Sequence, residues 1–337
     1  MAFLAEFLSD GGLPALSALT PAPRTEPLAV GAFAADLYQP AHFTSRSALV
    51  LVHGLAPQGK GDPRLRRAAD LLARAGFTVA VPTVPGLTGL RLRPEDAEPV
   101  VAAVQALRGR TRAQRVAVLG VSVGAGPALL AAADPRVADQ VSLVLSLGGY
   151  ASTVELLRYF LTGHYRFGPL SGRAQPNPEG ARLFLRANLD LLADRVDRAR
   201  LAAWLDAPGP APPSGLSHEG AAVAQLLANR DSARLEPLIA ALPPALRTLL
   251  EALSPERVVP RLRGRLSLAH GRNDPAVPFT ESVRLAEAAR VAGIPVRLAI
   301  VGVVEHVEAA GGPRSGWERT VELARLWAVV YDLFMSP

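Results

Sequence analysis

The chain has 337 residues, of which 49% are hydrophobic and 20% are charged. This composition excludes an intrinsically disordered protein and supplies enough apolar side chains for one large α/β domain with an insertion, or for two domains. The chain contains no cysteine, which excludes disulfides, thiolate nucleophiles and cysteine-based metal sites.

The formal net charge is +6, a balance that can indicate nucleic acid or an anionic membrane as a partner. However, Lys60 is the only lysine, and the arginines are scattered beside acidic residues rather than gathered in a basic run with interleaved aromatic side chains. The N-terminus lacks the positive region of a signal peptide, and Glu6 interrupts its apolar run. No apolar stretch of about 20 uncharged residues occurs. We therefore expect a cytoplasmic protein that binds no nucleic acid and has no membrane span.

The N-terminal half of the chain alternates between short apolar runs and helical stretches. A first strand is expected at 33–38, where Pro40 favours a sheet edge or a strand end. Asp62 is a good N-cap and Pro63 fits the first position of the helix that follows. The further predicted strands cover 47–53, 78–82, 115–121 and 141–147, and the predicted helices between them cover 63–75, 94–107 and 123–133.

The alternation stops after residue 150 and resumes near residue 265. Between these points we find helical periodicity and Pro and Gly breaks, but no convincing strand; the predicted helices cover 152–161, 180–192, 199–205, 220–228 and 244–253. A stretch of roughly 110 residues is too long for a structureless loop, so we expect an insertion. Beyond it, strands are predicted at 265–269 and 295–304, and helices at 280–292 and 317–334.

This order predicts an α/β fold with a mostly parallel central sheet flanked by helices. Residues 1–150 and 264–337 are expected to form the core, and residues 151–263 an inserted helical cap. The cap would begin and end at the carboxyl edge of the sheet. Because ligands bind at that edge in such sheets, we expect the cap to cover the site.

The strongest local signal is Gly120-Val121-Ser122-Val123-Gly124, which lies between a predicted strand and a predicted helix. This is the context of a nucleophile elbow, a sharp turn that projects a serine Oγ above the sheet. Glycines at both ends allow neighbouring backbone to pass close by. The pattern alone also fits an ordinary Gly-rich turn, but its position between strand and helix predicts that Ser122 is a catalytic nucleophile.

Serine needs a base to take its proton, and the base needs an orienting acid. His306 follows the predicted strand 295–304, and Asp274 follows the strand 265–269. Taken singly, His306 could be a surface histidine and Asp274 a turn residue. The chain order Ser, Asp, His and the position of each residue after a strand favour a catalytic triad of Ser122, Asp274 and His306.

The remaining parts of the predicted site are oxyanion donors and a substrate pocket. The backbone N–H groups of Leu55 and Val123 are expected to stabilise a tetrahedral oxyanion. His53 is expected to shape its loop rather than act as a second base. The histidines show no metal-like spacing, and Gly59-Lys60-Gly61 lacks the spacing of a phosphate loop, so we expect no metal and no other cofactor.

Residues 47–150 and 265–335 resemble the α/β-hydrolase superfamily, and are similar to uncharacterised bacterial serine esterases grouped with dienelactone-hydrolase-like proteins. The resemblance rests on the elbow, on His306, and on two short motifs, His53-Gly54 and Gly271-Arg272-Asn273-Asp274 followed by Val277-Pro278. It implies that the insertion is a cap. Dienelactone hydrolases use a cysteine nucleophile, which this chain lacks, and the aspartate nucleophile of haloalkane dehalogenases is replaced here by Ser122.

We therefore expect a serine hydrolase that cleaves carboxylic esters of small to medium apolar acyl groups. Tyr150, Tyr159 and Phe160 belong to the aromatic-rich start of the predicted cap and are expected to line the substrate pocket. Hydrolysis of a thioester, a C–C bond or a peptide would use the same triad, and a binding protein that kept the fold without turnover is a further alternative. The partner is expected to be a small-molecule ester, and the oligomeric state stays open.

Overall fold

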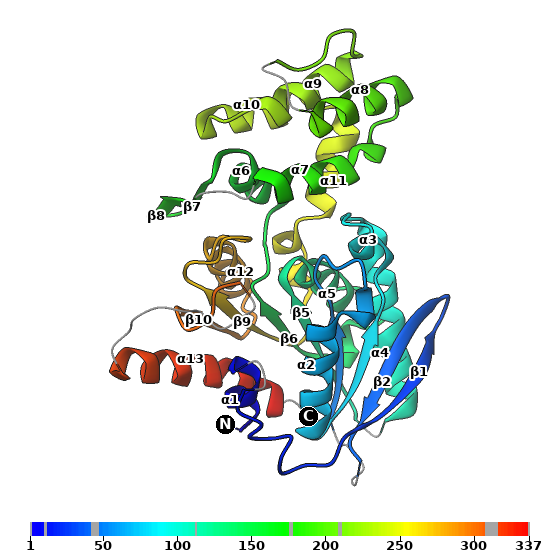
Figure 1. Ribbon diagram of the computed structural model, residues 1–337, viewed down its shortest axis with the longest axis vertical. Coiled ribbons are helices and arrows are strands. Elements are labelled where there is room, and N and C mark those ends of the chain that lie inside the picture. Colours follow the sequence, from blue (N-terminus) through cyan, green and yellow to red (C-terminus); the bar gives the residue numbers. More distant parts are fainter. Residues whose placement is uncertain are drawn as a thin grey trace.

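The computed structural model describes residues 2–9, 12–41, 47–111, 113–174, 178–207, 211–306 and 316–335. Its centre is an eight-stranded sheet with the order β1-β2-β4-β3-β5-β6-β9-β10 (Figure 1). The strands are β1 (Arg24–Val30), β2 (Phe33–Gln39), β3 (Ser47–Val52), β4 (Phe77–Pro82), β5 (Val116–Val121), β6 (Val141–Leu147), β9 (Arg265–Gly271) and β10 (Val296–Val301). All neighbours from β4 to β10 pair in parallel, whereas β1 and β2 are antiparallel. The predicted mostly parallel α/β sheet is confirmed.

The strand at the sheet edge is β1, which the sequence analysis did not identify. Its neighbour β2 pairs with β1 on one side and with β4 on the other, so 33–38 is not an edge strand. The alternative, that Pro40 marks a strand end, is confirmed, because β2 ends at Gln39. Pro27 lies in β1, where the missing N–H is tolerated because an edge strand needs only one set of ladder hydrogen bonds.

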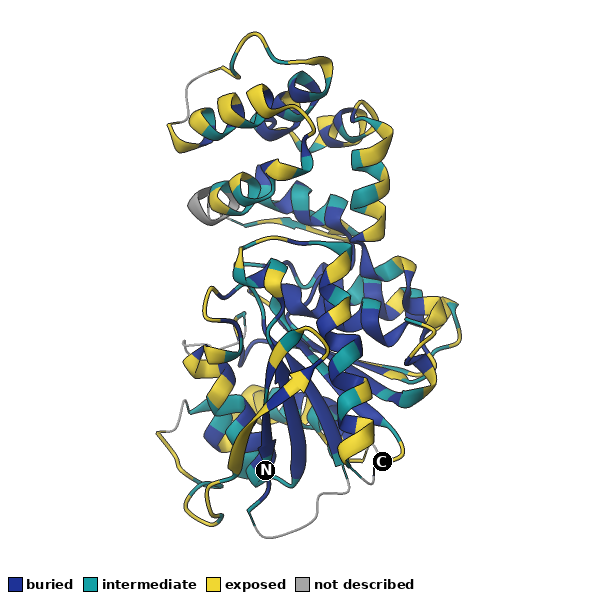
Figure 2. Ribbon diagram, turned by 90° about the vertical axis from the view of Figure 1, so that its right-hand side faces the viewer, coloured by how far each residue is buried: buried dark blue, intermediate teal, exposed yellow. Residues whose placement is uncertain are grey.

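Helices cover both faces of the sheet, which explains why the inner strands are largely apolar: every residue of β4 is buried. Figure 2 shows strands of the sheet coloured as buried. On one face α4 (Glu98–Arg110), α5 (Ala125–Ala132) and α12 (Thr280–Val291) contribute to a large apolar cluster. On the other face α1 (Ala2–Leu8), α2 (Pro63–Arg74) and α13 (Gly316–Phe334) contribute to a second. The predicted N-cap is present, since Asp62 accepts hydrogen bonds from the N–H groups of Arg64 and Leu65.

The segment between β6 and β9 forms a separate layer above the carboxyl ends of the strands (Figure 1). Its elements are α6 (Thr153–Thr162), β7 (His164–Phe167), β8 (Leu170–Arg173), α7 (Pro178–Ala187), α8 (Arg195–Asp206), α9 (His218–Ala228), α10 (Leu235–Ala240) and α11 (Pro244–Ala252). The expectation of a segment without strands is wrong, because β7 and β8 form an antiparallel hairpin. Gly168 has a φ of 54° in the two-residue turn between them, a conformation that such tight hairpin turns require.

The two ends of this layer lie side by side. The N–H of Thr153 donates to Ser254 Oγ at 3.1 Å, and the N–H of Glu256 donates to the carbonyl of Ala151 at 3.1 Å. Because β9 runs parallel to β6, it begins where the amino ends of the strands lie. The chain must therefore return along the core from the carboxyl ends of the strands before β9 can start. Only the start of the insertion therefore lies at the carboxyl edge by connectivity; its end is held there by these hydrogen bonds.

The returning stretch packs with the core rather than with the layer above. Val258, Val259 and Leu262 are buried in the same apolar cluster as α4 and α5. We therefore propose that the cap, predicted from the sequence as 151–263, ends near Leu253.

Candidate active site

Ser122 stands directly after β5, at the turn into α5, and its backbone has a φ of 54°. Leu90 is the only other non-glycine residue with a positive φ in the described part of the chain. Such a conformation costs on the order of 1–3 kcal/mol and persists only where the surrounding structure enforces it. The turn at Ser122 therefore has a strained backbone, as expected for a sharp strand-to-helix elbow.

The flanking glycines are required because neighbouring backbone passes within contact distance. A Cβ added to Gly120 would lie 2.5 Å from the Cα of Ala125, and one added to Gly124 would lie 2.1 Å from the carbonyl oxygen of His53. Both distances are shorter than any real contact, and in both cases the neighbour is main chain. The Gly-x-Ser-x-Gly spacing therefore lets β5 turn sharply while the end of β3 packs against it.

The three residues predicted as a triad lie together, linked by two short hydrogen bonds. His306 Nε2 is 2.7 Å from Ser122 Oγ, and His306 Nδ1 is 2.7 Å from Asp274 Oδ2. Because a carboxylate only accepts, Nδ1 carries the proton and Nε2 is the acceptor for the serine hydroxyl. The arrangement can move a proton from Ser122 to His306. Glu305, the neighbouring acid, is exposed to solvent.

Several hydrogen bonds stabilise the ionised form of Asp274, whose side chain is fully buried. Oδ1 accepts hydrogen bonds from the N–H groups of Ala276 and Val277 at 2.8 and 2.9 Å. Burial by itself would raise the pKa of Asp274, but the hydrogen bonds from His270 and His306 outweigh it and hold the pKa well below its ordinary value. Asp274 thus stays charged and fixes the ring of His306.

His270 is a buried neighbour of this acid. Its Nε2 lies 2.9 Å from the carbonyl of Val277 and 3.3 Å from Asp274 Oδ2, while its Nδ1 lies 2.7 Å from Ser282 Oγ. Since the carbonyl only accepts, Nε2 carries the proton and Nδ1 accepts from the serine hydroxyl. The ring therefore buttresses the loop that carries Asp274.

His53, at the end of β3, has both ring nitrogens engaged. Nε2 accepts from the N–H of Val84 at 3.0 Å, and Nδ1 lies 2.7 Å from the carbonyl of Gly54, to which it donates. Burial lowers the pKa of His53, so the ring is neutral at ordinary pH. This geometry gives His53 the loop-shaping role expected from the sequence.

The two amides predicted as oxyanion donors belong to the loops beside Ser122. Val123 follows the serine directly, and Leu55 lines the same cavity as Ser122 and His306. Gly54, the residue before Leu55, packs so close to the elbow that an added Cβ would lie 3.1 Å from Ser122 Cβ. The assignment of these two N–H groups as oxyanion donors stays a prediction.

The cavity that contains Ser122 and His306 has a volume of about 520 Å³. Its walls come from the loop after β3, from the first turns of α2, and from Phe7 and Leu8 at the end of α1. The wall formed by α1 was not anticipated. The spacing of Phe3, Leu4, Phe7 and Leu8 fits one apolar face of a helix and was the signal available for it.

The aromatic residues predicted to line the substrate pocket are placed elsewhere. Tyr150 is fully buried under α5, and its hydroxyl donates to the carbonyl of Leu253 at 3.0 Å. Tyr159 is 1% exposed, and its hydroxyl donates to the carbonyl of Pro275 at 2.9 Å. Both rings fill space between the cap and the core, and neither lines the cavity at Ser122.

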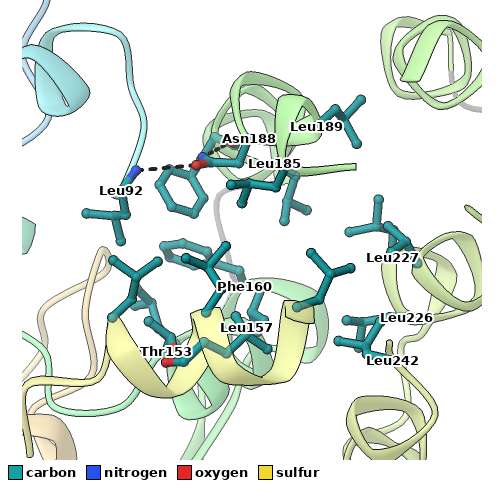
Figure 3. A pocket seen from close by; sticks show the side chains of 18 of the residues that line it. Leu92, Thr153, Leu157, Phe160, Leu185, Asn188, Leu189, Leu226, Leu227 and Leu242 are labelled. Atoms are coloured by element: carbon teal, nitrogen blue, oxygen red, sulfur yellow. Dashed lines mark hydrogen bonds between the residues drawn. The ribbon is translucent and has the colours of Figure 1, made fainter. Parts of the chain in front are cut away.

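Phe160 lines a different cavity, of about 140 Å³, which lies within the cap and is shown in Figure 3. Most of the side chains in its walls are leucines, and Phe160 packs edge-on against Phe184 at 5.7 Å between ring centroids. Asn188 holds the rim by accepting from the N–H of Leu92 at 3.3 Å. In the described part of the chain, this cap cavity shares no lining residue with the cavity at Ser122.

Two kinds of feature are absent from the described residues. None of their helices is long and apolar enough to cross a membrane. No cluster of three or more His, Asp or Glu side chains with the spacing of a metal site was found among them.

No protein-family model matches the chain, and no curated protein matches it. Several solved structures are similar to it. A puromycin-hydrolyzing peptidase from Mycobacterium tuberculosis is 19% identical with a TM-score of 0.54, over 93% of this chain and 39% of that one. Dipeptidyl peptidase 4 from Porphyromonas gingivalis is 14% identical with a TM-score of 0.53, over 97% and 38%. An acylaminoacyl peptidase from Pyrococcus horikoshii is 14% identical with a TM-score of 0.51, over 92% and 41%.

The chain thus spans about two fifths of the length of these peptidases. At such low identity the likeness concerns the fold and not the reaction. Together with the order of the sheet and the strained turn at Ser122, it shows that the chain has the α/β-hydrolase fold.

Proposed function

We propose that the protein is a serine hydrolase that cleaves carboxylic esters of small to medium apolar acyl groups. The observation that carries this proposal is the chain of two 2.7 Å hydrogen bonds that joins Ser122 to His306 and His306 to Asp274. Ordinary packing rarely needs a strained serine aligned with a histidine and a buried carboxylate. Such a constellation is recognised by its geometry and roles rather than by its sequence.

In the proposed mechanism Ser122 Oγ attacks the ester carbonyl while His306 Nε2 takes the hydroxyl proton. Asp274 stabilises the imidazolium that forms, and does not itself become protonated. The N–H groups of Val123 and Leu55 would stabilise the oxyanion of the tetrahedral intermediate, and each would lower the activation barrier by about 3 kcal/mol. His306 then gives the proton to the leaving alcohol, and water releases the acyl group in the reverse sequence.

The preference for apolar acyl groups is supported by the cavity beside Ser122. Phe7, Leu8, Leu55, Leu65 and Leu147 contribute to its walls, and its volume of about 520 Å³ lies within the range of small-molecule sites. A short or medium hydrocarbon chain would bury apolar surface against these side chains, whereas Asp62, Arg64 and Arg67 form a polar part of the wall.

The test is a substrate panel of p-nitrophenyl esters, acyl-CoA thioesters and aminoacyl amides, with Ser122→Ala as the control. We expect hydrolysis of the esters and a kcat about 10⁴-fold lower, or lower still, in the variant, with its thermal unfolding unchanged. A faster reaction with amides or thioesters would identify a peptidase or a thioesterase with the same triad. Equal activity in variant and wild type, or no labelling of Ser122 by a fluorophosphonate, would contradict the proposal.

A further inference from the structure

Helix α1 is anchored to the core by buried and paired side chains. Leu4 is 3% exposed and belongs to the apolar cluster of α2 and α13. Phe3 packs edge-on against Phe334 of α13, with 6.0 Å between ring centroids, where Figure 1 shows the two helices lying against each other. These contacts hold α1 to the face of the sheet occupied by α2 and α13.

A buried carboxylate fixes the end of the same helix. Glu6 is 4% exposed, and its Oε2 accepts hydrogen bonds from the N–H groups of Leu16 and Ser17 at 2.7 and 2.8 Å. Burial would raise the pKa of Glu6, but the hydrogen bonds from Ser17 and Leu16 outweigh it and lower the pKa. Glu6 therefore ties the turn after α1 back onto the helix and sets the position of the next residues, Phe7 and Leu8.

Phe7 and Leu8 form one wall of the cavity that contains Ser122 and His306, and Leu65 and Ala68 of α2 also line it. The side chains of Phe7 and Leu8 are partly exposed, as expected for groups that border a cavity. The Phe7 ring stacks on the ring of Phe3, with 6.0 Å between centroids. Because Phe3 is itself packed against α13, this contact holds the Phe7 ring in place.

We propose that α1 provides the acyl-chain subsite, with Phe7 and Leu8 in direct contact with the apolar chain of the substrate bound at Ser122. This inference rests on the proposed hydrolase function and deepens it. The cavity continues from the nucleophile to Phe7 and Leu8, so a chain attached to the reacting carbonyl reaches them within one enclosure. The apolar ring and the branched side chain favour hydrocarbon there.

The competing location is the cap cavity around Phe160, which is also apolar. Because the cap cavity shares no described residue with the cavity at Ser122, the two locations make opposite predictions. Phe160→Ala is therefore the matched control for Phe7→Ala, since both remove a partly buried ring from a cavity wall.

The first experiment measures kcat/KM for p-nitrophenyl esters with acyl chains of increasing length, from acetate to octanoate. Phe7→Ala should lower the ratio of octanoate to acetate activity about tenfold, the loss expected when one to two methylenes no longer bury their surface. Leu8→Ala should lower it in the same direction, and serves as the second variant if Phe7→Ala unfolds. Phe160→Ala should leave the ratio unchanged. An unchanged ratio in both α1 variants, or a drop in Phe160→Ala instead, would overturn the inference.

A second experiment is independent of turnover. Octanoate binding to Ser122→Ala is measured by calorimetry, with and without Phe7→Ala in the same chain. We expect the Kd to rise about tenfold in the double variant. If wild type hydrolyses no ester, the proposed function fails while this experiment still tests the subsite. An unchanged Kd, or no octanoate binding to Ser122→Ala, would overturn the role of α1 whatever the fate of the proposed function.

Discussion

A carboxyl group buried at the root of the cap should make the stability of the protein depend on pH. Glu281, on α12, is 1% exposed, and its Oε2 accepts from the N–H groups of Ala151 and Ser152 at 3.0 and 2.8 Å. Its Oε1 has no hydrogen-bond partner in the described part of the chain, and Arg284 Nε is 3.5 Å away. Burial raises the pKa of Glu281 to about 7, despite the opposing effect of Ser152, Arg284 and Ala151.

The size of the effect follows from the two pKa values. Below pH 4.5, the ordinary value, the carboxyl is protonated in both the folded and the unfolded chain, and its contribution to stability is fully present. As the pH rises from there to about 7, the unfolded chain releases the proton first, so the free energy of unfolding falls. The total loss is about 3 kcal/mol, since each pKa unit corresponds to about 1.4 kcal/mol.

Glu281→Gln removes this titration while keeping an oxygen that can accept from Ala151 and Ser152. Urea unfolding of wild type and variant at several pH values between 4 and 8.5 gives the difference in free energy of unfolding. We expect the variant to gain about 3 kcal/mol relative to wild type across this range. Glu287→Gln, a half-exposed glutamate on the same helix, is the matched control. A difference between Glu281→Gln and wild type that stays constant across the range would refute the reasoning.

Two further predictions concern the proposed site. Asp274→Asn should lower kcat by about 10⁴-fold, because the amide would leave His306 in the wrong tautomer. Glu305→Gln, the control, should leave kcat within a few-fold of wild type. If steady-state kinetics showed the reverse order, the acid would be misassigned. Gly124→Ala should destabilise the protein by several kcal/mol, since its Cβ would lie 2.1 Å from the carbonyl oxygen of His53, and a melting temperature within a degree of wild type would show that the elbow can relax.

Local sequence signals predicted most of the core correctly. The apolar run at 141–147 coincides with β6, and the Asp62-Pro63 pair marks the start of α2. Strands buried on both faces are continuously apolar, and a helix start needs a side-chain acceptor and tolerates proline, so both leave a clear pattern. The strand β1 was missed because an edge strand with one exposed face carries few apolar residues, and it also contains Pro27.

The candidate triad was predictable because its residue types and chain order are read locally. Each of Ser122, Asp274 and His306 follows a strand, and parallel strands bring their carboxyl ends to one edge of a sheet. Gly120 is also required locally, because its close neighbour is Ala125, whereas the close neighbour of Gly124 is His53 at the end of β3. His270 and His53 also lie at strand ends, and from there each forms hydrogen bonds with a neighbouring loop.

The pocket could not be read from the sequence in this way. The aromatic residues at the start of the cap suggested a pocket lining, yet Tyr150 and Tyr159 fill the junction between cap and core, while Phe7 and Leu8 reach the cavity from the N-terminal helix. Which apolar side chain borders a cavity depends on how elements far apart in the chain pack together. A sequence therefore indicates that a ring will be buried, but only the tertiary structure decides whether it is buried against protein or faces a space that a substrate can fill.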